Sequence, residues 1–114
     1  MRKYDKRKYD KIKTVINGQE VTVKQDSQTG QFFTRQNTGN IPVDYATISD
    51  RVTIGQCIKY WRLRHGYSQD ELAKRIGVAS PNVIAMWETG RRKPQKQYRL
   101  RLAEHLGYDI LTKD

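Results

Sequence analysis

Residues 68–90 read SQDELAKRIGVASPNVIAMWETG, and this stretch decides the fold of the chain. Ser68 is followed three residues later by Glu71, which is the form of a capping box and marks the start of a helix. Gly77 is the type of residue that closes a helix in the left-handed conformation. The positions that would face inward share a helical spacing: Leu72, Ala73 and Ile76.

A second helix is expected directly after this turn. Ser80 is a favourable N-cap residue, and Pro81 at the first helical position loses nothing by lacking an N–H. Ile84 and Trp87 would form the inward pair, and the glycine that closes the stretch would end the helix. The stretch therefore predicts two short helices, the second over residues 81–88, joined by a tight turn.

Helical spacing continues on both sides of this pair. Thr53 is the expected N-cap of a preceding helix, which should end at Gly66. A fourth helix is expected to run from after Pro94 to about Leu106, with a glycine as its stop. The apolar positions that these two helices would bury are Ile54, Ile58, Trp61, Leu102, Ala103 and Leu106. We expect residues 53–114 to form a four-helix domain.

Residues 12–40 are expected to form β-structure. Asn17-Gly18 lies between two β-branched runs, and this is a strong signal for a hairpin with a type I′ turn. A second turn at 27–30 leads into a third extended run, so the sequence predicts a three-stranded ribbon. Its packing face would contain Phe32 or Phe33 together with Val15, Val21 and Val23.

The segment between ribbon and helices is expected to be irregular. Residues 37–40 are polar and predict a linker. Ile41 to Asp44 would begin a short helical turn into Tyr45–Arg51, with Asp44 as a cap. Residues 12–52 would thus be ribbon and linker, and the fold class is α+β.

The first 11 residues contain a tandem repeat, RKYDK followed by RKYDK. Its high charge and lack of aliphatic side chains predict a solvated basic tail. The alternative is a basic arm that lies along phosphates or enters a minor groove. In that interpretation the residues contacting DNA would be Arg2, Lys3, Arg7 and Lys8.

The charge balance indicates a polyanionic partner. The formal net charge is +10, from 22 basic and 12 acidic side chains. Residues 1–13 hold seven basic and two acidic side chains, and residues 54–114 hold twelve and six. Two basic regions therefore flank a nearly neutral one, as expected for a protein that binds DNA, RNA or an anionic membrane at two surfaces.

Several other classes of protein are not expected. Cys57 is the only cysteine, which excludes an intrachain disulfide and a cysteine-built zinc site and makes a reducing cytoplasm the simplest location. No apolar run approaches the roughly 18 residues of a membrane span, and no secretory signal is found. The two histidines, His65 and His105, have no metal-ligand spacing, and catalytic motifs are lacking. We expect neither enzymatic activity nor a cofactor.

The helical region resembles the Cro-like, or XRE-type, helix-turn-helix family, which includes many phage repressors and plasmid or chromosomal regulators. One departure is Ala79, which lengthens the turn by a residue relative to the usual family spacing. The markers occur in order between Ile54 and about Tyr108: Gly55, Ile58, Trp61-Arg62, Gly66 to Ala73, Ile76 to Val78, Trp87 to Pro94, Leu102-Ala103 and Leu106-Gly107.

The resemblance implies roles for individual residues. Arg62 and Glu88 match the positions of a partly buried ion pair that ties two helices together. The side chains that would contact base edges are Asn82, Val83, Met86 and Gln69. Those that would contact phosphates are Ser68, Ser80, Arg91, Arg92 and Lys93. Since asparagine pairs bidentately with adenine, an A·T pair is expected opposite Asn82.

The function implied by the resemblance is that of a sequence-specific, double-stranded DNA-binding transcriptional regulator, by default a repressor. It would place helix 81–88 in the major groove and bind a palindromic operator as a homodimer. Two alternatives remain open. The first is an antitoxin with autoregulatory DNA binding, whose ribbon would bind a protein. The layout is similar to that of MqsA-type antitoxins, although those carry zinc-binding cysteines that this chain lacks. The second is a plasmid or phage accessory factor whose ribbon is a second DNA reader.

Overall fold

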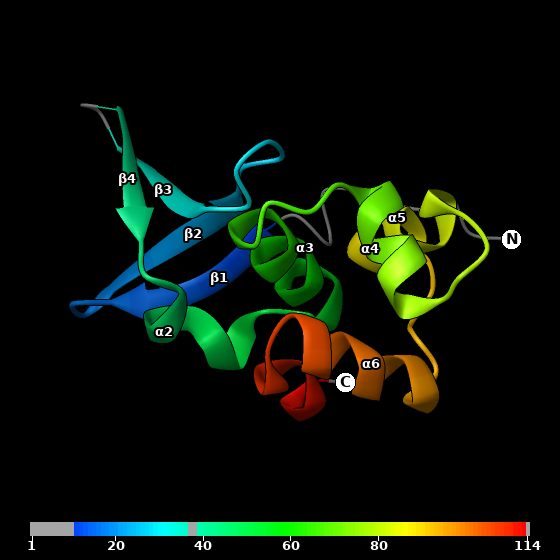
Figure 1. Ribbon diagram of the computed structural model, residues 1–114. Helices are drawn as coiled ribbons and strands as arrows, with labels where there is room; N and C mark the ends of the chain where they lie inside the picture. The colour runs from blue at the N-terminus through cyan, green and yellow to red at the C-terminus, as the bar shows by residue number, and fades with distance from the viewer. Residues whose placement is uncertain (1–10, 37–38, 114) are drawn as a thin grey trace, which may run out of the picture.

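The chain builds an antiparallel sheet first and a set of short helices second (Figure 1). The computed structural model describes residues 11–36 and 39–113. The strands are β1 (Lys11–Ile16), β2 (Gln19–Gln25), β3 (Phe32–Gln36) and β4 (Gly39–Val43). The helices are α2 (Tyr45–Ile48), η1 (Ser49–Arg51), α3 (Ile54–Arg64), α4 (Gln69–Ile76), α5 (Pro81–Glu88), α6 (Lys96–His105) and η2 (Tyr108–Thr112).

The four strands follow one another across the sheet in the order β1-β2-β3-β4. The hairpin between β1 and β2 turns at Asn17 and Gly18, whose φ angles are 53° and 77°. Positive φ at both central residues is the requirement of a type I′ turn, so this prediction is confirmed. The register then places Ile12 opposite Val23.

The strand β4 was not expected from the sequence. Gly39 and Asn40 belong to β4 and not to a polar linker, and Ile41 to Val43 pair with β3 instead of starting a helical turn. The predicted three-stranded ribbon is therefore a four-stranded sheet. Pro42 is tolerated because β4 is an edge strand, where a missing N–H costs no ladder bond. Asp44 precedes α2 at the N-cap position but makes no side-chain capping bond.

The two faces of the sheet differ in chemistry. The inner face buries Ile12, Val23, Phe32 and Val43. Val15 lies on the opposite face with 59% of its surface exposed, so its predicted place in the packing face is wrong. The reason is the two-residue period of a strand: burial of Ile12 directs Val15 outward.

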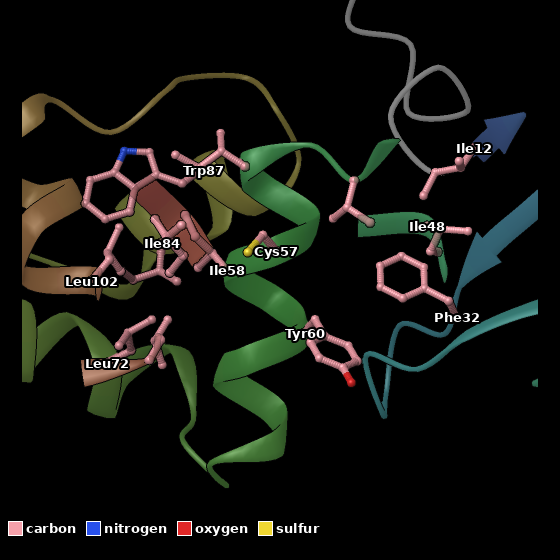
Figure 2. Packing of buried hydrophobic residues seen from close by; sticks show 14 of the residues in the cluster. Ile12, Phe32, Ile48, Cys57, Ile58, Tyr60, Leu72, Ile84, Trp87 and Leu102 are labelled. Carbon is pink, nitrogen blue, oxygen red and sulfur yellow. The ribbon is translucent and has the colours of Figure 1, made fainter. Parts of the chain in front are cut away.

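The sheet and the helices share one core, in which aromatic rings form the contact (Figure 2). Phe32 lies 5.8 Å from the ring of Tyr60 on α3 and 6.1 Å from Tyr45 on α2, measured between centroids. Tyr45 and Tyr60 stack on each other at 4.4 Å. Gln25 on β2 also donates to the backbone oxygen of Gln56 on α3 at 3.1 Å. The inner face of the sheet is therefore fixed against α2 and α3.

On its other side, α3 packs against α5 with almost no space between their backbones. Gly55 makes this possible, because a Cβ atom at this position would lie 2.3 Å from the Trp87 carbonyl oxygen and 2.8 Å from that of Glu88. The helix begins as expected at Thr53, whose hydroxyl accepts from Gln56 N in a capping box. Figure 2 shows the result: Ile84 and Trp87 lie on one side of α3 and Phe32 on the other.

This close approach predicts a specific destabilisation. Gly55→Ala is expected to lower the free energy of unfolding by about 1–3 kcal/mol, the usual cost of forcing extra atoms into a packed core. Urea denaturation followed by circular dichroism measures it. Gly107→Ala is the matched control, because its Cβ would meet the Trp61 ring at an ordinary 3.9 Å. Equal losses in the two variants would contradict the proposed crowding between α3 and α5.

Candidate nucleic-acid interface

The unit formed by α4, the turn at residues 77–80 and α5 is held in shape by its own caps. Ser68 Oγ accepts from Glu71 N at 3.0 Å, and the Glu71 carboxylate accepts from Ser68 N at 3.2 Å. Gly77 has a φ of 87° and ends α4 in the left-handed conformation. Arg101 on α6 donates to the Ile76 carbonyl at 2.8 Å, which satisfies a free carbonyl at the same end.

The beginning of α5 follows the expected pattern. Ser80 Oγ accepts from Asn82 N at 3.2 Å, and Pro81 occupies the first helical turn. These local bonds fix where the helix starts and therefore which side chains point outward.

The two sides of α5 have different environments. Ile84 is completely buried and Trp87 is 4% exposed, so both face the core as predicted. Asn82 is exposed, whereas Val83 and Met86 are half-buried. Asn82 and Met86 come from the side of α5 that faces away from the core, whereas Val83 packs against the core at its edge.

A buried ion pair lies behind α5. Arg62 Nε and Glu88 Oε2 are 2.6 Å apart, and Arg62 Nη2 donates to Glu88 Oε1 at 3.2 Å. Their side chains are only 8% and 3% exposed. Arg62 Nη1 donates to the Tyr67 carbonyl at 2.8 Å. The guanidinium thus binds the end of α5 and the turn before α4 at the same time.

Gln69 belongs to this network, which the sequence did not predict. Its Nε2 donates to Glu88 Oε1 at 3.1 Å, and the side chain is half-buried. The amide therefore connects the first turn of α4 to the last residue of α5. Since these residues are 19 positions apart, no local spacing signals the contact.

A basic loop, residues 91–93, follows the C-terminal end of α5. Thr89 is the C-cap, and Gly90 has a φ of 79°. Arg92 N donates to the Met86 carbonyl at 3.3 Å, so the loop turns back along the helix. Exposed side chains follow one another here: Arg91, Arg92 and Lys93. The buried Pro94 anchors the end of the loop.

The cysteine that the sequence contains lies in the core. Cys57 is buried, with its Sγ 3.2 Å from the Tyr45 hydroxyl, which donates to Asp109. Burial raises the pKa of the Cys57 thiol to about 11, so it stays protonated near neutral pH. Within the described ranges no three His, Cys, Asp or Glu side chains are placed to hold a metal ion. The predicted arm residues Arg2, Lys3, Arg7 and Lys8 lie outside the described residues.

None of the described helices has the length and apolar character that crossing a membrane requires.

The ion pair predicts a large and non-additive effect on stability. Arg62→Ala should lower the free energy of unfolding by about 3–5 kcal/mol, because it leaves Glu88 buried without a cation. The double variant Arg62→Ala/Glu88→Ala should cost less than the sum of its single variants. The control is Lys74→Ala, which removes an exposed pair with Asp70 and should cost less than about 1 kcal/mol. An Arg62→Ala loss no larger than that of the control would contradict this assignment.

Comparison with known proteins places this geometry in a family. A family described as helix-turn-helix matches residues 58–112, from within α3 to the end of η2. An uncharacterized HTH-type transcriptional regulator of Archaeoglobus fulgidus is 38% identical over 66 residues, covering 52% of this chain and 28% of that protein. Another, from Methanocaldococcus jannaschii, is 34% identical over 53 residues, covering 46% of this chain and 79% of that protein.

No solved structure gives a significant match. Among the two curated relatives, the chain spans little more than a quarter of the Archaeoglobus protein and most of the Methanocaldococcus protein. The capped α4-turn-α5 unit and the matched residues agree, and the chain belongs to the Cro/C1-type, XRE family of helix-turn-helix DNA-binding transcriptional regulators.

Proposed function

We propose that this protein is a sequence-specific regulator of transcription that inserts α5 into the major groove of duplex DNA. The observation that carries the proposal is the outward side of α5, with Asn82 exposed and with the Arg62–Glu88 pair fixing the helix from behind. A helix held in one orientation can present the same side chains to every site it meets. Repression is the mode we propose, because it needs only that the bound protein occludes a promoter.

The chemistry of α5 favours A·T-containing half-sites. The Asn82 amide can form a bidentate pair with adenine, in which its nitrogen donates to N7 and its oxygen accepts from N6. Val83 and Met86 offer apolar surface for a thymine methyl group. No arginine or lysine occurs within Pro81–Glu88, so the usual bidentate contact to guanine is lacking in this helix.

Phosphate contacts are proposed at the starts of α4 and α5 and in the loop that follows α5. The Ser68 and Ser80 oxygens accept backbone N–H groups, which leaves each hydroxyl proton free to donate to a phosphate. Arg91, Arg92 and Lys93 add positive charge beyond the opposite end of α5. Binding should therefore weaken steeply with salt. Gln69 is proposed to reach the DNA through its carbonyl oxygen or through the second N–H of Nε2, because Glu88 accepts only one of the two N–H groups.

A test of base contact is Asn82→Ala. The site should first be selected from random duplexes with the wild-type protein. We expect the variant to bind that site about 5- to 150-fold more weakly, equivalent to 1–3 kcal/mol, and to lose its preference at one A·T pair. Fluorescence anisotropy against all four pairs at that position measures both effects.

Gln19→Ala is the matched control, because it truncates another exposed amide in the β1–β2 hairpin region. It should leave affinity and preference unchanged. If Asn82→Ala weakened binding to all sequences equally, α5 would not read bases through this residue.

We also propose a homodimer that pairs through α6 and η2. Large apolar side chains are exposed on these two elements: Leu100 at 49%, Tyr108 at 70% and Leu111 at 44%. Exposed apolar side chains gathered in neighbouring elements are typical of interaction sites. A two-fold pair of such modules would read two half-sites about one helical turn apart.

The dimer can be tested by placing charges on this surface. The double variant Tyr108→Glu/Leu111→Glu should sediment as a monomer at concentrations where the wild type is a dimer, because two desolvated carboxylates oppose association. Val15→Glu is the control, since it charges an equally exposed apolar residue on the sheet and should leave the dimer intact. Unchanged sedimentation of the double variant would show that the chain associates elsewhere or not at all.

A further inference from the structure

We propose that the outer face of the sheet is a second DNA-binding surface, which holds the phosphate backbone of a duplex segment other than the one bound by α5. We define the outer face by four exposed cations, Lys11, Lys13, Lys24 and Arg35, and by the side chains between them, Thr22 and Phe33. The inference rests on the proposed function for the choice of DNA as the polyanion.

The strand register gathers these cations. Lys11 lies directly opposite Lys24, and Lys24 lies directly opposite Phe33. Lys13 lies opposite Thr22. Thr22, Lys24 and Arg35 border one shallow depression between β2 and β3, and Lys11, Lys24 and Phe33 border a second. The cations thus span three neighbouring strands and form a continuous surface.

Within the part of the chain that the structure describes, no ion pair neutralises these charges. Among residues 11–36 and 39–113 the ion pairs found are Arg62–Glu88 and Lys74–Asp70, neither of them in the sheet. Two like charges directly opposite each other destabilise an antiparallel pair, so Lys11 and Lys24 do not serve the stability of the sheet. A phosphate between them would remove their repulsion.

Two acidic residues border this face and are outnumbered by its four cations. Glu20 lies opposite Val15 and lines the first depression with Lys24 and Arg35. Asp26 lines the second depression, and its carboxylate accepts from Gln28 N at 2.7 Å and from Thr29 N at 3.1 Å.

The composition of the outer face favours a polyanion over a protein. Its apolar side chains are the exposed Val15 and Pro42 and the half-buried Phe33. Cores of protein interfaces are rich in aromatic and apolar residues and poor in lysine, whereas this face has lysines at its centre. Regularly spaced cations on a strand pair suit the repeating charge of a nucleic-acid backbone.

The geometry assigns this surface to a separate DNA segment. The inner face of the sheet packs on Tyr45 and Tyr60, and α5 packs on the other side of α3 near Gly55. Figures 1 and 2 show α3 between the sheet and α5. Since the outer face points away from α3, a straight duplex lying on α5 does not reach it, and one protomer would link two segments.

A bridging experiment tests the proposal. The full-length protein is bound to the selected operator duplex on beads, and a labelled second duplex of unrelated sequence is added. We expect the wild type to retain the second duplex. The triple variant Lys11→Gln/Lys24→Gln/Arg35→Gln should retain at least roughly tenfold less of the second duplex, because three phosphate contacts are lost. Its affinity for the operator alone should stay unchanged.

The conservative variant Lys11→Arg/Lys24→Arg is the matched control, since it changes the same positions without changing charge and should retain the second duplex. The urea midpoint of the triple variant should equal or exceed that of the wild type, because the Lys11–Lys24 repulsion is gone. This measurement separates loss of the surface from loss of the fold.

Three results would overturn the inference. If the wild type binds the operator but no second duplex, the outer face is not a DNA surface. This result is the one expected of a sheet that binds a protein, and it leaves the proposed function standing. If the triple variant loses operator affinity as much as bridging, the outer face belongs to the primary contact. If single-stranded DNA or RNA displaces the labelled duplex while excess unlabelled duplex does not, the outer face binds a polymer other than duplex DNA. Failure of the wild type to bind any duplex would instead refute the proposed function itself.

Discussion

The buried bond between Arg62 and Glu88 is the constraint on which the orientation of α5 depends. Arg62 uses Nε and Nη2 for Glu88 and Nη1 for the Tyr67 carbonyl, and Gln69 donates to the same carboxylate. A planar guanidinium bound at three nitrogens tolerates little rotation. Any movement of α5 that separates the two charges leaves each of them buried with neither its partner nor water to compensate it. The helix α5 is therefore held by an electrostatic penalty in addition to apolar packing.

The helix α3 transmits this constraint through the molecule, because its two sides support different layers. Gly55 lets the end of α5 approach the backbone of α3, while Tyr60 receives Phe32 from the sheet. Neither layer buries enough apolar surface to be stable alone: a small sheet is marginal without a packing partner, and helices of eight residues, such as α4, are marginal in water. Sharing α3 solves both problems with one core.

The sequence predicted the parts of the fold whose signals are local. The Ser68–Glu71 box and the Asn17-Gly18 turn each report backbone geometry within four residues, and both are present. The strand β4 exists only because Phe32 on β3 provides a partner for Val43, which no local preference reveals. Which side chains of β1 face the core likewise depends on how β1 pairs with β2. At the candidate site, helical phase placed Asn82, but the Gln69–Glu88 bond depends on tertiary proximity alone.

The positions of the two layers explain where the described cations lie relative to α3. Both the sheet and α5 turn their apolar sides to α3, which lies between them. The exposed cations of the sheet and those of the loop after α5, Arg91 to Lys93, therefore belong to different layers. A helix with its side chains is about 10 Å across, which exceeds the Debye length of about 8 Å at physiological ionic strength. Charge neutralised by a phosphate at one surface is therefore largely screened from the other. In the function proposed here, an operator on α5 would leave the attraction of the outer face for DNA essentially undiminished, which is the electrostatic condition for one protomer to bind two segments at once.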